Sequence, residues 1–138
     1  MKRSDAKRCL RALHEAQQVF YAGGPGDALR ELLTEDVRWH VPGSNAIAGR
    51  YRGIEEVMDY FARRRDLASR TFRMFPGELL VGEGPYVASL TEGRATIGDE
   101  EHRWSTVGLY RFRGSRVAAV WLLPLDQDEF DRIWAERP

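Results

Sequence analysis

The chain has 138 residues, enough for one domain with a single hydrophobic core. Its 21 basic and 21 acidic side chains cancel at pH 7, which argues against nucleic acid or an anionic membrane surface as a partner. The single cysteine, Cys9, excludes an internal disulfide and a cysteine-rich zinc site. No apolar run has membrane-spanning length, and the segment MKRSDAKRCL (1–10) lacks the apolar region of a signal peptide, so a cytoplasmic location is expected.

The N-terminal half is predicted to be mainly helical. Apolar residues recur with a helical period up to Tyr21, and the Gly- and Pro-containing segment 22–27 ends that helix. Residues 36–41 alternate apolar and polar side chains, as strands do. The elements predicted in this half are helices at about 4–21, 27–33 and 54–68 and a strand at 36–41. The basic run FARRRD (61–66) is interpreted as a solvent-exposed helix face.

From Thr71 onward the sequence pattern is extended. Short turns separate the extended segments, and consecutive strands joined by short turns pair antiparallel. The predicted elements are strands at 71–84, 86–98, 102–114 and 116–125 and a last helix at 126–134. This order predicts one α+β domain over residues 1–138, with three N-terminal helices in the concave face of a strongly curved, mainly antiparallel sheet.

Alternation assigns a face to each side chain of the sheet. Trp104 and Tyr110 share one face of their strand, and the aromatic side chains, Trp121 included, are expected to point into the hollow beneath the helices. The opposite face carries arginines together with Val107 and Leu109. A half-apolar outer face predicts a homodimer through the sheet, and a mixed solvent-exposed face is the alternative.

The segment DVRWHVPGSNAIAGRYRGIEEVMDYFARR (36–64) resembles the signature of SnoaL-like proteins, within the nuclear transport factor 2-like superfamily. The later LYRFRGSRVAAVWLLPLDQDEFDRIW (109–134) resembles the final hairpin and terminal helix of that family. The resemblance covers nearly the whole chain. It implies a cone-shaped pocket and, in many members, a dimer. The superfamily includes polyketide cyclases, ketosteroid isomerases, epoxide hydrolases, dehydratases and non-catalytic carriers, so the fold does not fix the activity.

The catalytic residues of these relatives match this chain only in part. Aligned on Gly43 and Ser44, the base of the isomerases falls at or near His40. The two oxyanion groups of the isomerases fall near Gln17 and at Gly108, neither of which is the expected residue, so steroid isomerisation is disfavoured. Glu92 and Arg94 form only a fragment of the epoxide hydrolase set.

His40 is the candidate catalytic residue. An imidazole exchanges a proton near neutral pH, and Tyr110, Gln17 or the indole N–H of Trp104 could stabilise an oxyanion nearby. Two other interpretations stay open: a polar group that lines the pocket without catalysis, and a structural residue that caps the strand. His14 and His102 are predicted to lie on the surface. Histidine spacing indicates no metal site, and no cofactor is expected.

The sequence therefore predicts a protein that binds a small apolar molecule. The first hypothesis is a cofactor-free acid/base isomerase, cyclase or lyase acting on a carbonyl or polyketide-like compound. The alternative is a non-catalytic ligand carrier or a dimeric accessory module. The segment 42–53 is expected to be a loop that packs the third helix against the first strand. The residues predicted to line the pocket are Gln17, Trp39, Phe61, Trp104, Tyr110 and Trp121.

Overall fold

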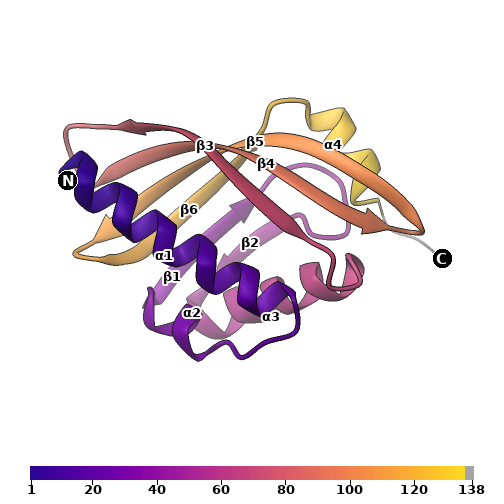
Figure 1. Cartoon of the computed structure of the whole chain (residues 1–138), viewed down its shortest axis with the longest axis horizontal. Coiled ribbons are helices and arrows are strands. Elements are labelled where there is room, and N and C mark those ends of the chain that lie inside the picture. The colour runs from indigo at the N-terminus through magenta and orange to yellow at the C-terminus, as the bar shows by residue number, and fades with distance from the viewer. Residues whose placement is uncertain (136–138) are drawn as a thin grey trace.

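The computed structural model describes residues 1–135 as an α+β fold, as predicted. The helices are α1 (Arg3–Tyr21), α2 (Asp27–Glu31), α3 (Gly53–Leu67) and α4 (Gln127–Ile133). The strands are β1 (Leu33–Val41), β2 (Gly49–Arg52), β3 (Arg73–Val81), β4 (Tyr86–Ile97), β5 (Glu100–Arg113) and β6 (Arg116–Pro124). In Figure 1, α1 runs along the sheet below β3, and α2 and α3 lie beneath β1 and β2.

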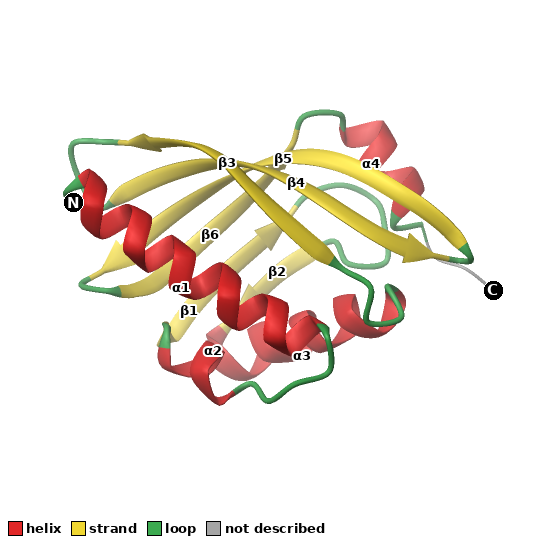
Figure 2. Ribbon diagram, viewed as in Figure 1, coloured by secondary structure: helices red, strands yellow, loops and turns green. Residues whose placement is uncertain are grey.

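The strands of the described residues form one curved sheet in the order β2-β1-β6-β5-β4-β3. Strands β3 to β6 pair antiparallel with their neighbours in the chain, which confirms the predicted meander. The first strand joins this meander by pairing parallel with β6. The sheet does not close, since β2 and β3 are its two edges. Figure 2 shows the strong twist of this sheet. It also shows α4 at the upper right, away from α2 and α3.

One strand was absent from the sequence prediction. Residues 49–52 lie in the segment expected to be a loop, but they form β2 and pair antiparallel with the end of β1. Its sequence, GRYR, contains no apolar alternation that would signal a strand, and only Tyr51 contributes a large ring. Residues 49–52 therefore form a strand because they pair with β1, and not because their own sequence has a strand pattern.

The preceding loop, residues 42–48, packs against α4, whereas the expected contact with the third helix is made by β2, where Tyr51 stacks on Tyr60 at 4.5 Å. The side chain of Asn45 donates to Asp131 of α4, and the backbone N–H of Ala46 donates to the carbonyl of Trp134. Gly43 has a φ of +99°, and a Cβ there would lie 2.1 Å from Asp131 Oδ1. The positive φ and the closeness of this side chain of α4 both favour glycine at this position.

The core fills the space between the helices and the concave face of the sheet. Aromatic rings dominate it: Trp39 meets Phe61 edge-on at 4.8 Å, and Trp104 meets Trp134 edge-on at 5.5 Å. Helix α4 supplies Trp134 and Phe130 to this cluster, so it closes the end of the hollow that the first three helices leave uncovered. The result is a cone with very little empty interior space.

Candidate functional site

The interior of the cone contains a small cavity of about 30 Å³, which we call the interior cavity. Helices α1 and α3, strand β1 and the meander of strands β3 to β6 all contribute to its wall. Its lining residues are His14, Gln17, Trp39, Arg64, Phe72, Met74, Thr91, Gly93, Trp104, Thr106, Tyr110 and Leu122. None of these described residues is an aspartate or a glutamate. The polar groups that face the cavity are therefore neutral or cationic.

Helical spacing explains why two polar residues of α1 point inward. Residues 10, 13, 14, 17 and 21 follow the i, i+3, i+4, i+7 pattern of one helix face, and all five are buried. This face places His14 and Gln17 beside the cavity, so the prediction of a surface position for His14 is wrong. Val19 of the same helix lies outside this face and is 51% exposed, although it is apolar.

His14 and Tyr110 form a buried polar pair in the interior cavity. The Nε2 atom of His14 lies 3.4 Å from the hydroxyl of Tyr110, a long hydrogen bond between α1 and β5. Burial lowers the pKa of His14 from 6.5 to about 4 and, as the main cause, raises the pKa of Tyr110 to about 12. At neutral pH the imidazole is therefore uncharged and the phenol keeps its proton.

Arg64 is a second buried polar group at this cavity, and it contradicts the interpretation of the FARRRD run as solvent-exposed. It is 4% exposed, because α3 directs it inward with Val57, Tyr60 and Phe61. Its guanidinium donates from Nε and Nη2 to the hydroxyl of Tyr21. The rings within 4.7 to 5.9 Å of its central carbon are those of Tyr21, Tyr60, Phe61 and Phe72.

Glycines shape two parts of the cavity wall. A Cβ at Gly108 would lie 2.7 Å from the ring of Tyr110, and one at Gly93 would lie 2.5 Å from the ring of Trp104. Gly108 is the position to which the resemblance assigned the isomerase aspartic acid. The ring of Tyr110 occupies the space that such a side chain would need, so a polar group of different chemistry faces the cavity here.

The structure separates the predicted site residues into two groups. Gln17, Trp39, Trp104 and Tyr110 line the interior cavity, and Phe61 packs directly behind Trp39. His40 and Trp121 lie on the opposite face of the sheet, where their parallel rings are 5.5 Å apart. The expected inward position of Trp121 is wrong, because Val120 and Leu122 take the inward positions of β6.

The location of His40 follows from the same alternation. Trp39 points inward from β1, so its neighbour points outward. Burial, and then the nearby positive charges of Arg50, Arg38 and Arg52, lower the pKa of His40. A catalytic role for His40 stays a prediction, and any such reaction would take place on the outer face.

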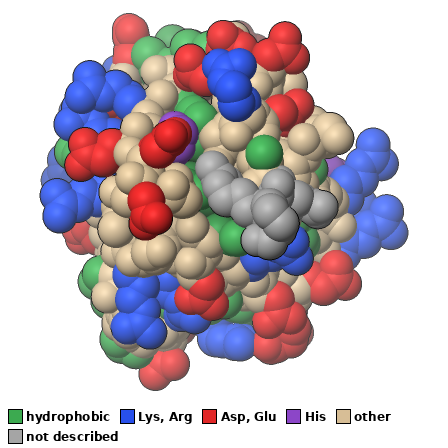
Figure 3. All heavy atoms as spheres, turned by 90° about the vertical axis from the view of Figure 1, so that its right-hand side faces the viewer, with side chains coloured by type: hydrophobic (Ala, Val, Ile, Leu, Met, Phe, Trp, Pro, Cys, Tyr) green, Lys and Arg blue, Asp and Glu red, His purple; other side chains and the backbone are tan. Residues whose placement is uncertain are grey.

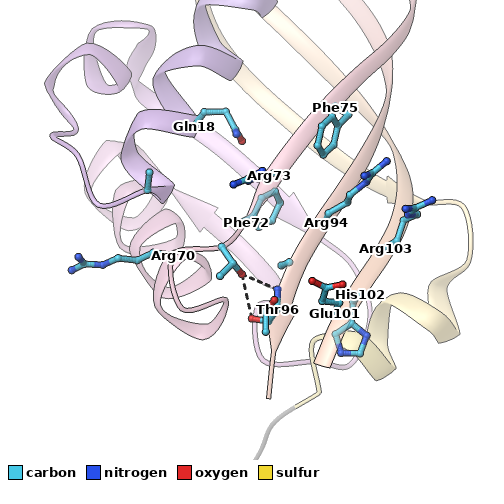
Figure 4. A pocket seen from close by; sticks show the side chains of 13 residues that line it. Gln18, Arg70, Phe72, Arg73, Phe75, Arg94, Thr96, Glu101, His102 and Arg103 are labelled. Atoms are coloured by element: carbon cyan, nitrogen blue, oxygen red, sulfur yellow. Dashed lines mark hydrogen bonds between the residues drawn. The ribbon is translucent and has the colours of Figure 1, made fainter. Parts of the chain in front are cut away.

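Two larger grooves adjoin the interior cavity. The α1–β3 groove, about 620 Å³ in volume, shares His14 and Met74 with the cavity wall. The arginine groove, about 690 Å³, contains Arg70, Arg73, Arg94 and Arg103 and is separated from the cavity by Phe72, which lines both. Figure 4 shows Arg73, Arg94 and Arg103 near Phe75 and Glu101, whereas Arg70 points away from them. Glu92 pairs with both Arg94 and Arg103, so their charge is partly neutralised.

The surface offers no comparable concentration of functional groups on the face seen in Figure 3, where acidic and basic side chains are interspersed and hydrophobic ones form small patches. No helix within residues 1–135 combines the length and apolar character that a membrane span requires. Across the same residues, no group of three or more His, Cys, Asp or Glu side chains is placed to hold a metal ion.

Comparison with known proteins identifies the family. Residues 11–120 match the model of the SnoaL-like domain, so the chain belongs to this family. A comparison with curated proteins gives no match.

Solved structures confirm the nuclear transport factor 2-like fold. Bal32a, from a soil-derived mobile gene cassette, is 23% identical with a TM-score of 0.82, and the match covers 94% of this chain and 98% of that one. A nuclear transport factor 2-like protein of Burkholderia pseudomallei is 20% identical with a TM-score of 0.78, covering 99% and 100%. A Sinorhizobium meliloti protein with the provisional name polyketide cyclase is 15% identical with a TM-score of 0.68, covering 88% and 99%.

Proposed function

We propose that the protein binds a small, largely apolar carbonyl compound inside the cone and moves a proton on it without a cofactor. The observation that carries this proposal is the pair formed by His14 and Tyr110 at the wall of the interior cavity. It supplies an uncharged base next to a hydroxyl donor in a site shielded from water. The provisional name of the Sinorhizobium meliloti neighbour supports chemistry on carbonyl or polyketide-like compounds.

The two side chains have complementary roles in this reaction. The neutral imidazole of His14 takes a proton from the carbon next to the carbonyl. The C–H electron pair forms a carbon–carbon double bond, and the carbonyl π pair moves to the oxygen to give an enolate. The hydroxyl of Tyr110, which keeps its proton because its pKa is raised to about 12, donates a hydrogen bond to that oxygen. In an unsaturated ketone, return of the proton from His14 to a more distant carbon of the conjugated system completes an isomerisation. In a cyclisation, the enolate carbon attacks a second carbonyl of the same molecule, and the imidazolium of His14 protonates the alkoxide that forms.

Entry of a ligand requires the cavity wall to move. The cavity volume of about 30 Å³ is far below the roughly 300–1,000 Å³ of a typical ligand pocket. Met74 and Leu122 are half-buried side chains at this wall, and Met74 is also part of the α1–β3 groove. An unbranched thioether changes rotamer easily, so displacement of Met74 joins the groove to the cavity. The ligand therefore enters between α1 and β3, past His14.

The outer face of the sheet supports a homodimer as the working assembly. Trp121 lies between His40 and Tyr86, with ring distances of 5.5 and 6.3 Å. Leu90 and Leu123 are exposed on the same sheet. Apolar side chains in such number on an exposed sheet face favour a second copy of this chain as the partner, in the cytoplasm.

Exchange of carbon-bound hydrogen in D₂O tests the reaction even when the natural product is unknown. We would follow 2-tetralone and ethyl acetoacetate by proton NMR and compare the native protein with His14→Gln, Tyr110→Phe and, as the matched control, His40→Gln. The native protein should accelerate exchange of at least one probe over buffer. His14→Gln should lose at least about tenfold of that acceleration, and His40→Gln should stay within about twofold of the native rate. Loss in His40→Gln alone would contradict the assignment to His14 and favour His40.

The carrier hypothesis predicts a different result. Native and denaturing mass spectra of freshly purified protein would then show a retained small molecule, while exchange of the probes in D₂O would proceed no faster than in buffer. That combination would reject catalysis and keep ligand binding. The apolar majority of the cavity wall is the feature that favours this second function.

A further inference from the structure

We infer that Arg64 binds an anionic oxygen of the ligand, so that the interior accepts an apolar molecule carrying one negatively charged oxygen. The inference rests on the proposed function, because it requires a ligand in the same cavity. It narrows the ligand class to a carboxylate, a phenolate or an enolate, whereas the sequence predicted only a small apolar compound.

The first support is the missing countercharge of Arg64. Taking a guanidinium out of water is costly unless an anion accompanies it. Each of the ion pairs found among residues 1–135 involves other cations: Arg8, Arg30, Arg65, Arg94, His102, Arg103 and Arg113. Arg64 has instead the neutral hydroxyl of Tyr21 and four aromatic rings. These contacts lessen the cost of burial but leave the positive charge unpaired.

The second support is the free hydrogen-bonding capacity of this guanidinium. Nε and Nη2 both donate to Tyr21, while Nη1 has no acceptor within residues 1–135. Arg64 also lines the interior cavity, so a ligand atom there lies within its reach. A guanidinium offers donors in a planar fork that suits a carboxylate or a delocalised oxyanion.

The third support is the excess of donors around the cavity. The hydroxyl of Thr91 lines it and is buried without a hydrogen-bond partner. His14 is uncharged at neutral pH, and no carboxylate contributes to the wall among the described residues. A site with a cation, unused donors and no negative charge is complementary to an anion. The proposed enolate would meet this requirement as it forms.

Binding of 4-nitrophenol, measured by the absorbance of its phenolate, tests the inference, with 4-nitroanisole as a neutral control of similar shape. The native protein should bind the phenolate at least about tenfold more tightly than the anisole, and bound 4-nitrophenol should ionise at a lower pH than in buffer. Arg64→Met should abolish the preference, and Arg64→Lys should retain part of it. Arg73→Met, in the exposed arginine groove, should leave it unchanged.

A second variant tests the inference where Arg64→Met does not fold. Tyr21→Phe keeps the charge of Arg64 but removes the hydroxyl that occupies it, so phenolate affinity should rise. Equal binding of phenolate and anisole would overturn this inference but not the proposed function. A preference lost in Arg73→Met but kept in Arg64→Met would do the same.

Binding of neither probe would overturn the proposed function as well. Competition by benzoate but not benzamide would assign the site to carboxylates, whereas failure of benzoate to compete would assign it to phenolates and enolates.

Discussion

Asn45 Nδ2 donates to Asp131 Oδ1 at 2.7 Å and so ties the loop after β1 to the last helix, 86 residues later in the chain. The same carboxylate accepts from the backbone N–H of Ser44 at 3.2 Å and from Gln127 Nε2 at 2.9 Å. One carboxylate on α4 therefore organises the whole turn that leads into β2. Because α4 also covers the aromatic end of the cone, this contact joins a surface loop to the core.

Replacement of Asp131 by alanine should lower the free energy of unfolding by about 1–2 kcal/mol, since three donors lose their acceptor. Asp128→Ala, on the exposed side of the same helix, is the matched control and should change it by less than about 0.5 kcal/mol. Urea denaturation measures both. Equal losses of stability in the two variants would mean that the hydrogen bonds of Asp131 to the loop add no stability beyond what replacing any aspartate of this helix removes.

Gly43→Ala should be more destabilising than Gly114→Ala. Both glycines have positive φ, +99° and +63°, so an alanine is strained at either position. A Cβ at Gly114 has no neighbour within 4 Å, whereas one at Gly43 would lie 2.1 Å from Asp131 and 2.3 Å from Gln127. Gly114→Ala should cost about 1 kcal/mol and Gly43→Ala at least about 2 kcal/mol. If thermal unfolding shows equal losses, the loop can move away from α4 without penalty.

Stability should decrease between pH 6.5 and pH 4 because of His14. Its pKa is about 4 in the folded protein and 6.5 for a histidine in water, so in this range the unfolded chain binds a proton that the folded protein does not. Stability is therefore greatest above pH 6.5 and falls by up to about 3 kcal/mol as the pH approaches 4. Urea titrations at pH 7, 6, 5 and 4 measure this slope.

Two variants separate the contributions of the histidines to this slope. His14→Gln should flatten the pH dependence between pH 6.5 and 4. His40→Gln should preserve most of it, because His40 is more exposed, although burial lowers its pKa in the same direction. A flat profile in the native protein would contradict a buried, neutral His14.

Leu123→Glu should dissociate the proposed homodimer. Leu123 is 47% exposed on the outer face, and a carboxylate there would be desolvated against the second copy. Leu125→Glu is the control, since Leu125 is 64% exposed beyond the end of β6. Light scattering after size-exclusion chromatography gives the mass of each variant. A native protein of monomeric mass would reject the dimer.

The sequence predicted the sheet better than the site. Alternation in 86–97 and 100–113 is regular and predicts both long strands, and the short turn between them predicts their antiparallel pairing. The site residues are polar exceptions within helical faces. Arg64 follows Val57, Tyr60 and Phe61 at helical spacing, a signal that could have placed it inside, but two neighbouring arginines made the run resemble a solvated face. His14 is a similar exception, a polar residue on an otherwise buried face of α1.

Other features had no local signal at all. Strand β2 exists because β1 offers it an edge, and the contact between Asn45 and Asp131 joins residues whose sequence separation carries no pattern. The direction of Trp121 depends on the register of β6 against β5, where alternation alone allows either face. Such features need the assembled sheet before they can be assigned.

The parallel pairing of β1 with β6 has a consequence for the order of folding. Trp39 lies opposite Val120, so the first strand finds its place only after the last strand has been made. Until then the N-terminal helices and β1 can form local structure, but the cone has no continuous wall. Contacts so distant in sequence slow folding, and a chain stopped after β5 would leave one edge of β1 without its strand partner and open to pairing with other proteins. During synthesis, this protein therefore depends on its final strand to pair the open edge of its first one.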